Sequence, residues 1–271
     1  MRVVRNVMLV ALLGLSGSAS ASAARTSETG FLDRTVTVNQ VTYRYQVYVP
    51  NNWTKNEKWP VILFLHGAGE RGDDGLVQTE VGIGTAIRRY SARFPAVIVF
   101  PQCRKTRWWP EEEMEAQAMA ALTQSVKEFN GDPQRVYLTG ISMGGYGTWS
   151  LASKNPGKFA AIAPVCGGIR PPALRAVPAA TPVPEVKDPY RTAAEKIGQT
   201  PVWIFHGSAD PAVPTDESRK MNEALKAAGG NVKYTEYEGV GHNSWDRAYA
   251  EQELMTWMLA QRTSPASRAS R

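Results

Sequence analysis

One serine of this chain lies in a setting that could support covalent chemistry. The segment 140–144 reads Gly-Ile-Ser-Met-Gly, with Ser142 at its centre. The apolar segment 135–139 before it is typical of a buried strand, and helical periodicity begins at Tyr146. A serine on a sharp turn from strand to helix presents its hydroxyl above the sheet, and flanking glycines remove the Cβ atoms that would clash there. This placement, more than the short motif alone, predicts a nucleophile at Ser142.

A serine hydroxyl needs a nearby base, which is normally a histidine oriented by a carboxylate. The chain contains three histidines. His66 and His206 each precede a glycine at the end of an apolar segment, where a neutral histidine commonly anchors the loop that follows. His242 stands in a glycine-rich loop, before the last segment of helical periodicity. We therefore predict that His242 is the base.

The carboxylate that orients the base is expected between the serine and the histidine, since this is the chain order that accompanies a nucleophile on a strand-to-helix turn of this type. Asp210 comes shortly after the apolar segment 201–205, which places it at the sheet edge where Ser142 emerges. Asp216 is the alternative, but it opens a predicted helix, where an aspartate more often serves as a cap. Glu238 and Asp246 stand too close to the histidine in sequence to orient it. Asp210 is the predicted acid.

Acyl transfer produces an oxyanion, which two preorganised hydrogen-bond donors must stabilise. The first donor is expected to be the backbone N–H of Met143, the residue after the nucleophile. The second is expected from the loop that follows the first predicted buried strand. We assign it to Ala68, with Gly69 as the alternative.

Short apolar segments alternate along the chain with segments of helical periodicity. Buried strands are predicted at 60–65, 96–100, 135–139 and 201–205, with a weaker one at 159–165 and a later one at 232–237. Helices are predicted at 85–93, 111–129, 146–154, 216–228 and 247–260. Alternating residues at 34–38 and 43–49 predict an N-terminal antiparallel hairpin at a sheet edge. The chain is therefore expected to be of the α/β class, with a mainly parallel central sheet and helices on both faces.

Three tryptophans fall in loops on the predicted catalytic edge of the sheet. Trp108, Trp109 and Trp245 could stack on an aromatic or sugar ring of a substrate, although each could equally pack beneath its loop. Trp149 and Trp203 lie within predicted helix and strand and are expected in the core. Aromatic walls favour a short-acyl or aromatic ester over a long-chain lipid.

The two cysteines of the chain, Cys103 and Cys166, both follow predicted strands. Two interpretations stay open: a disulfide bond between their loops, or two separate buried thiols. The chain has no Cys-X-X-Cys pair and three histidines in all, so no metal site is expected. No cofactor is expected either.

The first 23 residues have the three parts of an export signal. Arg2 and Arg5 precede an apolar run at 7–15, and small residues follow up to Ala23. We predict cleavage after Ala23 and a secreted or periplasmic location. The apolar run is too short to span a bilayer, so no membrane insertion is expected.

The remainder is predicted to form one catalytic domain over residues 24–262. Within it, residues 169–200 are rich in proline and are predicted to form an excursion over the site. Residues 263–271 are small and polar and are predicted to be a disordered tail. The net charge is +6, with basic residues scattered rather than clustered, so no nucleic-acid partner is expected.

Beyond these features, the chain resembles the α/β-hydrolases, and within them bacterial secreted esterases. It is similar to carbohydrate esterase family 1, polyhydroxybutyrate depolymerases and dienelactone hydrolase-like proteins. The segments that carry the resemblance are 65–72, 101–103 followed by Trp108-Trp109, 140–145, 206–214, and 241–242 followed by Trp245. The resemblance implies the α/β-hydrolase fold and a Ser-His-Asp triad.

Together, residues and resemblance predict a secreted serine carboxylesterase that acts on short-acyl or aromatic esters of the feruloyl and acetyl type. The expected partner is therefore an ester substrate, either a small molecule or one attached to a polymer. A polyester depolymerase or a serine peptidase with the same triad is the alternative. A binding protein without activity is the remote alternative, which an intact set of Ser142, Asp210 and His242 argues against.

Overall fold

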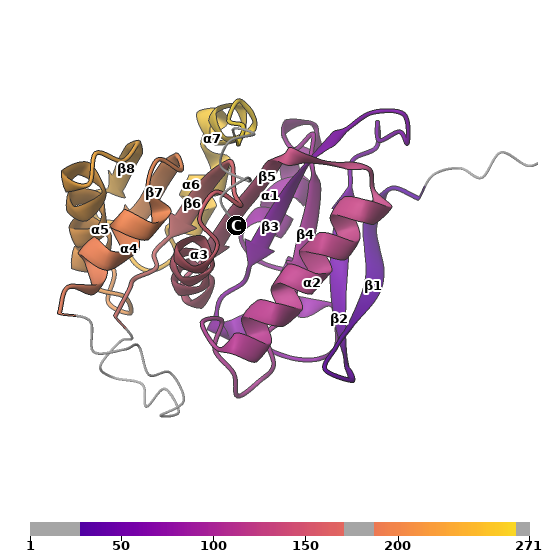
Figure 1. Ribbon diagram of the computed structural model, residues 1–271, viewed down its shortest axis with the longest axis horizontal. Helices are drawn as coiled ribbons and strands as arrows, with labels where there is room; N and C mark the ends of the chain where they lie inside the picture. The colour runs from indigo at the N-terminus through magenta and orange to yellow at the C-terminus, as the bar shows by residue number, and fades with distance from the viewer. Residues whose placement is uncertain (1–27, 171–186, 264–271) are drawn as a thin grey trace, which may run out of the picture.

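The computed structural model describes residues 28–170 and 187–263 of the chain (Figure 1). The predicted export signal at 1–23 lies outside these residues. So do positions 171–186 of the proline-rich segment and all but the first residue of the predicted tail. No helix among the described residues is long and apolar enough to cross a lipid bilayer.

A sheet of eight strands forms the centre of the described chain, in the order β1-β2-β4-β3-β5-β6-β7-β8. β1 and β2 pair with each other in antiparallel fashion, β2 pairs antiparallel with β4, and the other neighbours are parallel. The strands are β1 (Gly30–Val38), β2 (Val41–Val49), β3 (Trp59–Leu65), β4 (Val97–Pro101), β5 (Gly131–Ile141), β6 (Ala161–Val165), β7 (Val202–Gly207) and β8 (Val232–Tyr237). The predicted mainly parallel sheet with an N-terminal hairpin is confirmed.

The hairpin closes over a turn of two residues. Val38 pairs with Val41, and Asn39 and Gln40 between them have φ angles of 48° and 66°. Two-residue hairpin turns of type I′ need a positive φ at both central positions, because only then does the turn follow the twist of the strands. The turn therefore fixes the register of β1 against β2 along their full length.

Helices cover both faces of the sheet. Figure 1 shows α2 to α5 on the near face, with α1, α6 and α7 behind. The strands supply both faces in alternation: Val61 and Leu63 of β3 pack with the first group, Ile62 and Phe64 with the second. The helices are α1 (Ile83–Tyr90), α2 (Glu112–Glu128), α3 (Met143–Lys154), α4 (Pro189–Ile197), α5 (Asp216–Ala227), α6 (Trp245–Ala250) and α7 (Gln252–Leu259), with short 3-10 helices η1 (Ala68–Glu70), η2 (Val77–Thr79) and η3 (Ser91–Arg93).

The proline-rich segment contains a helix that the sequence analysis did not predict. The Asp188 side chain accepts a hydrogen bond from the N–H of Arg191, and Pro189 occupies the first helical position of α4. Both features are signals for the start of a helix, because the side chain satisfies a free N–H and proline has none to lose. The surrounding prolines masked this signal.

The last predicted helix, 247–260, is two helices in the structure. The chain breaks at Glu251, whose ψ of 123° is extended. The Arg93 guanidinium donates hydrogen bonds to the backbone carbonyls of Ala250 and Glu251 at the break. This long-range partner satisfies carbonyl groups at the end of α6.

Glu217, in the first turn of α5, holds the chain on both sides of the undescribed positions. Its Oε2 accepts hydrogen bonds from the N–H groups of Ile169 at 2.8 Å and Arg170 at 3.1 Å. Its Oε1 accepts one from the Tyr190 hydroxyl at 2.6 Å. The described chain before position 171 and after position 186 is thus tied to the helix that follows Asp210.

Candidate active site

Ser142 is the single residue between β5 and α3. Its φ of 52° and ψ of −116° turn the chain sharply, and its N–H donates to the Val165 carbonyl at 3.0 Å. A positive φ is uncommon for a residue with a side chain and is held only where the surroundings enforce it. The strained turn lifts the hydroxyl above the carboxyl edge of the sheet.

Two glycines allow this turn to pack closely. A Cβ at Gly144 would lie 1.9 Å from the Leu65 carbonyl oxygen, and one at Gly140 would lie 2.3 Å from the Gly144 carbonyl oxygen. Both contacts are with backbone that cannot move aside. The glycines of the motif are therefore required by the fold around Ser142.

The structure brings Ser142, His242 and Asp210 together in a hydrogen-bonded line. His242 Nε2 lies 2.9 Å from Ser142 Oγ, and His242 Nδ1 lies 2.7 Å from Asp210 Oδ2. Since the carboxylate can only accept, Nδ1 carries the proton and Nε2 turns its lone pair toward the serine hydroxyl. This is the geometry that a base needs in order to accept the serine proton.

Asp210 is enclosed, and four hydrogen bonds reach its carboxylate. Burial by itself raises the pKa of Asp210, but hydrogen bonds from His206, His242 and the backbone of Val213 and Ala212 outweigh it. The pKa of Asp210 therefore lies well below its ordinary value. The carboxylate keeps its charge and can stabilise a protonated His242.

His206 is a second imidazole on the same carboxylate. Its Nε2 lies 3.1 Å from both Asp210 Oδ2 and the Val213 carbonyl oxygen, and its Nδ1 lies 2.7 Å from Ser218 Oγ. The ring is fully buried at the end of β7. His206 thus holds the Asp210 loop, as the sequence analysis expected, and also contacts the carboxylate itself.

The predicted oxyanion donors lie at the starts of two helices beside Ser142. Met143 is the first residue of α3 and Ala68 the first of η1, followed by Gly69. The first N–H groups of a helix have no acceptor within it, so they are available to a ligand. Both donors line one cavity together with the serine.

His66 and Arg71 hold the loop that carries Ala68. His66 Nδ1 donates to the Gly67 carbonyl at 2.6 Å, and its Nε2 accepts from the Cys103 N–H at 2.9 Å. Burial lowers the pKa of His66 to about 4, so the ring is neutral. Arg71 Nε donates to the Ala68 carbonyl at 3.0 Å. The loop is therefore fixed before any substrate binds.

A cavity of about 500 Å³ opens above Ser142. Trp108 and Tyr146 form one wall, their rings 5.4 Å apart between centroids. Trp245 forms another and packs edge-on against the His242 ring at 5.4 Å. Two of the three tryptophans predicted to contact substrate thus line the cavity.

Trp109, the third predicted tryptophan, does not line this cavity. It is 1% exposed, and its Nε1 donates to the His66 carbonyl at 2.9 Å. Its ring packs edge-on against the His66 ring, with 5.0 Å between centroids. Trp109 therefore supports the loop of Ala68 from below, and its assignment to substrate binding was wrong.

Cys103 and Cys166 are free and buried, so the disulfide interpretation does not hold in the structure. Cys103 packs in the core on the α2 face of the sheet and Cys166 in the core on the α1 face. Both residues follow strands at the same edge, but the sheet separates their side chains. Burial raises the pKa of Cys166 to about 12, which keeps the thiol neutral.

One group among the described residues has the composition of a metal site. The ligand atoms of Cys166, Asp210 and His242 lie within 4.8 Å of one another. Asp210 and His242 already bond to each other, however, and the thiol is protonated. The donor set therefore fits proton relay to Ser142 better than it fits metal binding.

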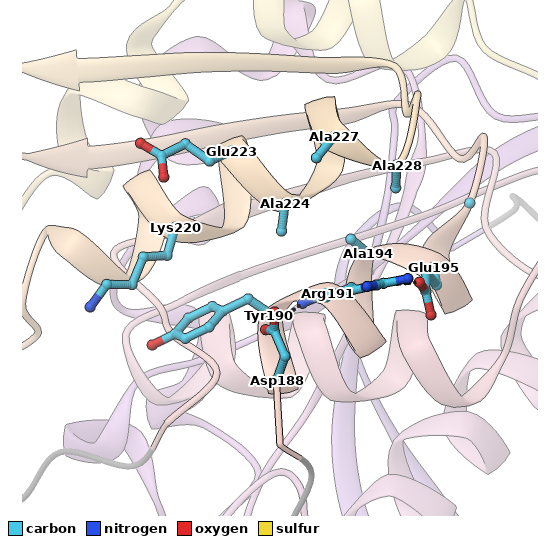
Figure 2. A pocket seen from close by; sticks show the side chains of 11 residues that line it. Asp188, Tyr190, Arg191, Ala194, Glu195, Lys220, Glu223, Ala224, Ala227 and Ala228 are labelled. Carbon is cyan, nitrogen blue, oxygen red and sulfur yellow. Dashed lines mark hydrogen bonds and ion pairs between the residues drawn. The ribbon is translucent and has the colours of Figure 1, made fainter.

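A larger hollow of about 800 Å³ lies away from this site, between α4 and α5 (Figure 2). Alanines of both helices form its floor, and the Arg191–Glu195 ion pair of 2.7 Å lies on α4 at its rim. None of its lining residues belongs to the set around Ser142. The volume of this hollow does not by itself indicate a catalytic function.

Three residues of the site were not predicted from the sequence. Tyr146 lines the cavity, Glu70 lines it from the loop that carries Ala68, and His206 contacts Asp210. The spacing of Tyr146 could have revealed it, because residue i+4 on a helix lies one turn above residue i on the same face. His206 and Asp210 are four positions apart at the end of a predicted strand, and this spacing likewise indicates that their side chains could meet.

The strand order, the turn at Ser142 and the line from Asp210 through His242 define an α/β-hydrolase. Comparison with known proteins makes the assignment more specific. The dienelactone hydrolase family matches residues 100–253, which is more than half of the chain. The chain belongs to this family and is a hydrolase.

Similar proteins include esterases of several kinds. A solved thermostable esterase has 32% sequence identity and a TM-score of 0.72, and the match covers 86% of this chain and 63% of that one. The bifunctional acetylxylan esterase/xylanase XynS20E of Neocallimastix patriciarum is 35% identical over 141 residues, covering 51% of this chain and 19% of that protein. A ferulic acid esterase with 18% identity and a TM-score of 0.64, over 84% of this chain and 97% of that one, shares the fold.

The chain spans between 19% and 27% of the length of the first curated relatives that it matches. The activities of those whole proteins therefore describe the relatives alone.

Proposed function

We propose that this protein is a serine carboxylesterase that hydrolyses short-acyl or aromatic esters through a triad of Ser142, His242 and Asp210. The observation that carries the proposal is the continuous hydrogen-bonded line from the buried Asp210 carboxylate to the serine hydroxyl. This line ends at the foot of a cavity with aromatic walls.

In the proposed mechanism, Ser142 Oγ attacks the ester carbonyl carbon while its proton passes to His242 Nε2. The carbonyl oxygen becomes an oxyanion, which the N–H groups of Met143 and Ala68 stabilise. His242 then gives the proton to the leaving alcohol oxygen, the ester C–O bond breaks, and an acyl-serine remains. Water attacks the acyl-serine by the same proton route and releases the acid.

The cavity and the relatives support the choice of substrate class. A volume of about 500 Å³ between Trp108, Tyr146 and Trp245 suits an acetyl group or a single phenolic ring. The solved esterase at 32% identity and the acetylxylan esterase at 35% identity are consistent with an ester bond as the target. We therefore place acetyl and feruloyl esters first.

We further propose that residues 1–23 direct export and that residues 24–262 are the catalytic domain, with a secreted or periplasmic location. The N-terminal charge, apolar run and small residues support this. N-terminal sequencing of protein from the culture medium or periplasm should begin at Ala24. An intact Met1 on all the recovered protein would overturn the export proposal.

The test of the function compares the wild type with Ser142→Ala. We expect a fluorophosphonate probe to label the wild type alone, and hydrolysis of p-nitrophenyl acetate to fall by at least about 10⁴-fold in the variant. Ser153→Ala on the same helix is the matched control and should keep both. Equal hydrolysis by wild type and Ser142→Ala would reject the proposal.

Methyl ferulate, acetylated xylan, polyhydroxybutyrate and a peptide amide then separate the substrate classes. We expect the first two to be hydrolysed fastest. Faster turnover of the polyester or of the peptide would reassign the protein to a depolymerase or a peptidase with the same triad.

A further inference from the structure

Glu70 is the one carboxylate among the described residues that line the cavity. Apart from the His242 ring, none of the described residues that line it has a basic side chain. Tryptophan, tyrosine, proline, alanine and valine side chains make up most of the remaining wall. A single acidic group in such a wall affects which substrates bind, because no other carboxylate or basic side chain among the described lining residues offsets its charge.

The Glu70 carboxylate lies close to the reacting serine. Its Oε2 is 3.1 Å from the point that a Cβ on Gly67 would occupy, and Ser142 Cβ is 3.7 Å from the same point, so the two atoms are at most about 7 Å apart. A short ester bound to Ser142 would therefore place its substituents within reach of Glu70.

Among the described residues, no basic side chain forms an ion pair with this carboxylate. Burial raises the pKa of Glu70 above its ordinary value, and hydrogen bonds from the backbone N–H groups of Gly67 and Glu70 offset this only in part. The neighbouring Arg71 instead donates to the carbonyls of Ala68 and Arg107. The carboxylate is thus left with capacity to accept a hydrogen bond from a ligand.

We propose that Glu70 forms a subsite that accepts a hydrogen bond from a hydroxyl or ammonium group on the substrate and excludes esters that carry a carboxylate at that place. This inference rests on the proposed esterase function. It narrows the substrate class to esters with a hydrogen-bond donor near the scissile bond, such as partially acylated polyols or sugars.

The test uses esters of one size that differ in a single group. Ethyl butanoate, ethyl 3-hydroxybutanoate, ethyl 3-aminobutanoate and monoethyl succinate vary the acyl side, and propyl acetate, 2-hydroxyethyl acetate, 2-aminoethyl acetate and acetoxyacetate vary the alcohol side. We measure kcat/KM for each at roughly pH 8, where a glutamate is ionised. On at least one side, the wild type should prefer the hydroxyl or ammonium ester to the alkyl ester and disfavour the carboxylate ester by about tenfold or more.

Two substitutions separate charge from hydrogen bonding. Glu70→Gln keeps a hydrogen-bond acceptor for the Gly67 N–H and for the substrate. We therefore expect one ratio alone to change: kcat/KM for the carboxylate ester, relative to that for the alkyl ester, should rise by about tenfold. Glu70→Ala should also remove the preference for the donor-bearing ester. Glu112→Gln, an exposed glutamate on α2, is the matched control and should leave all ratios unchanged.

Each outcome decides the proposal. An unchanged ratio of carboxylate to alkyl ester in Glu70→Gln would overturn it, and so would an equal loss for all esters, since that would make Glu70 only a support of the loop. If the wild type hydrolyses no ester above the Ser142→Ala background, the proposed function fails and this inference fails with it. Hydrolysis of the alkyl esters alone rejects the subsite and leaves the esterase function intact.

Discussion

Two regions of the molecule begin with the same dipeptide, His-Gly, but the two histidines have different hydrogen-bond partners. His66-Gly67 follows β3 and His206-Gly207 follows β7, and both imidazoles are fully buried at the carboxyl edge of the sheet. His66 bonds to backbone on both nitrogens. His206 has a carboxylate, Asp210, on one nitrogen and a serine hydroxyl on the other.

The difference lies in which part of the site each histidine positions. His66 holds a loop whose N–H groups stabilise negative charge in the proposed mechanism, and it needs no charge of its own. His206 holds the loop of a carboxylate that must stay ionised. A buried histidine at a strand end is therefore a general support, and its polar partner determines what it supports.

The largest effect on kcat is expected from a change at Asp210, the charged residue of the His206 region. Asp210→Asn should lower kcat by about 10³–10⁴-fold, because the amide no longer fixes the His242 tautomer or stabilises the imidazolium. Steady-state kinetics on p-nitrophenyl acetate would measure this. Asp216→Asn, which removes an exposed ion pair with Arg219, is the control and should stay within about twofold. Comparable losses in both variants would contradict the assignment of the acid.

His66 should affect how the free energy of unfolding depends on pH. The pKa of His66 falls from 6.5 to about 4 on folding, so folding disfavours protonation of this ring. The contribution of the neutral ring to the free energy of unfolding is complete above pH 6.5 and is lost as the pH falls toward 4. Over this range the free energy of unfolding changes because of His66 by at most about 1.4 kcal/mol per pH unit. Urea unfolding across this range should show a shallower decline for His66→Gln than for the wild type. Parallel curves would contradict the neutral buried state.

A smaller effect is expected from His206 itself. His206→Leu should lower kcat by about tenfold, since one of the hydrogen bonds to the Asp210 carboxylate is lost, while KM stays within about twofold. His206→Gln retains a donor in the same direction and should restore part of kcat. If His206→Leu changed KM as much as kcat, the residue would act on the substrate cavity and not on Asp210.

The smallest effect is expected from reductant. Cys103 donates its N–H to His66, and Cys166 donates its N–H to Phe205 beside His206, so each cysteine belongs to one of the two regions. Because the sheet separates their side chains, the melting temperature should be the same with and without dithiothreitol. Alkylation of the denatured, unreduced protein should count two thiols per chain. A count of zero would show a bridge that the structure does not contain.

Much of the candidate site could be predicted because its signals are local. Ser142 stands on a turn that its own glycines and flanking strand and helix specify, and Asp210 and His242 each follow a strand. The pair Asp188-Pro189 was equally readable as the start of α4. Neighbouring prolines conceal it, because a proline-rich segment is typical of irregular chain.

Other features could not be predicted, because their outcome depends on contacts between distant segments. Trp108 and Trp109 are adjacent, yet one lines the cavity while the other donates to the His66 carbonyl beneath it. Cys103 and Cys166 follow strands at one edge, and the face that each occupies depends on the local backbone, including the φ of 41° at Cys166. No pattern of residue types distinguishes these alternatives.

The sequence by itself determined the alternation of strand and helix and the strained turn at Ser142, since periodicity and short-range sterics act between near neighbours. Only the tertiary structure decided which side chains meet there. His242 is 100 positions from Ser142 and 32 from Asp210 in the chain, and the order of β5, β6, β7 and β8 in the sheet brings the three together. Strand order results from the packing of the whole core, and it is what brings the proposed nucleophile, base and acid into contact.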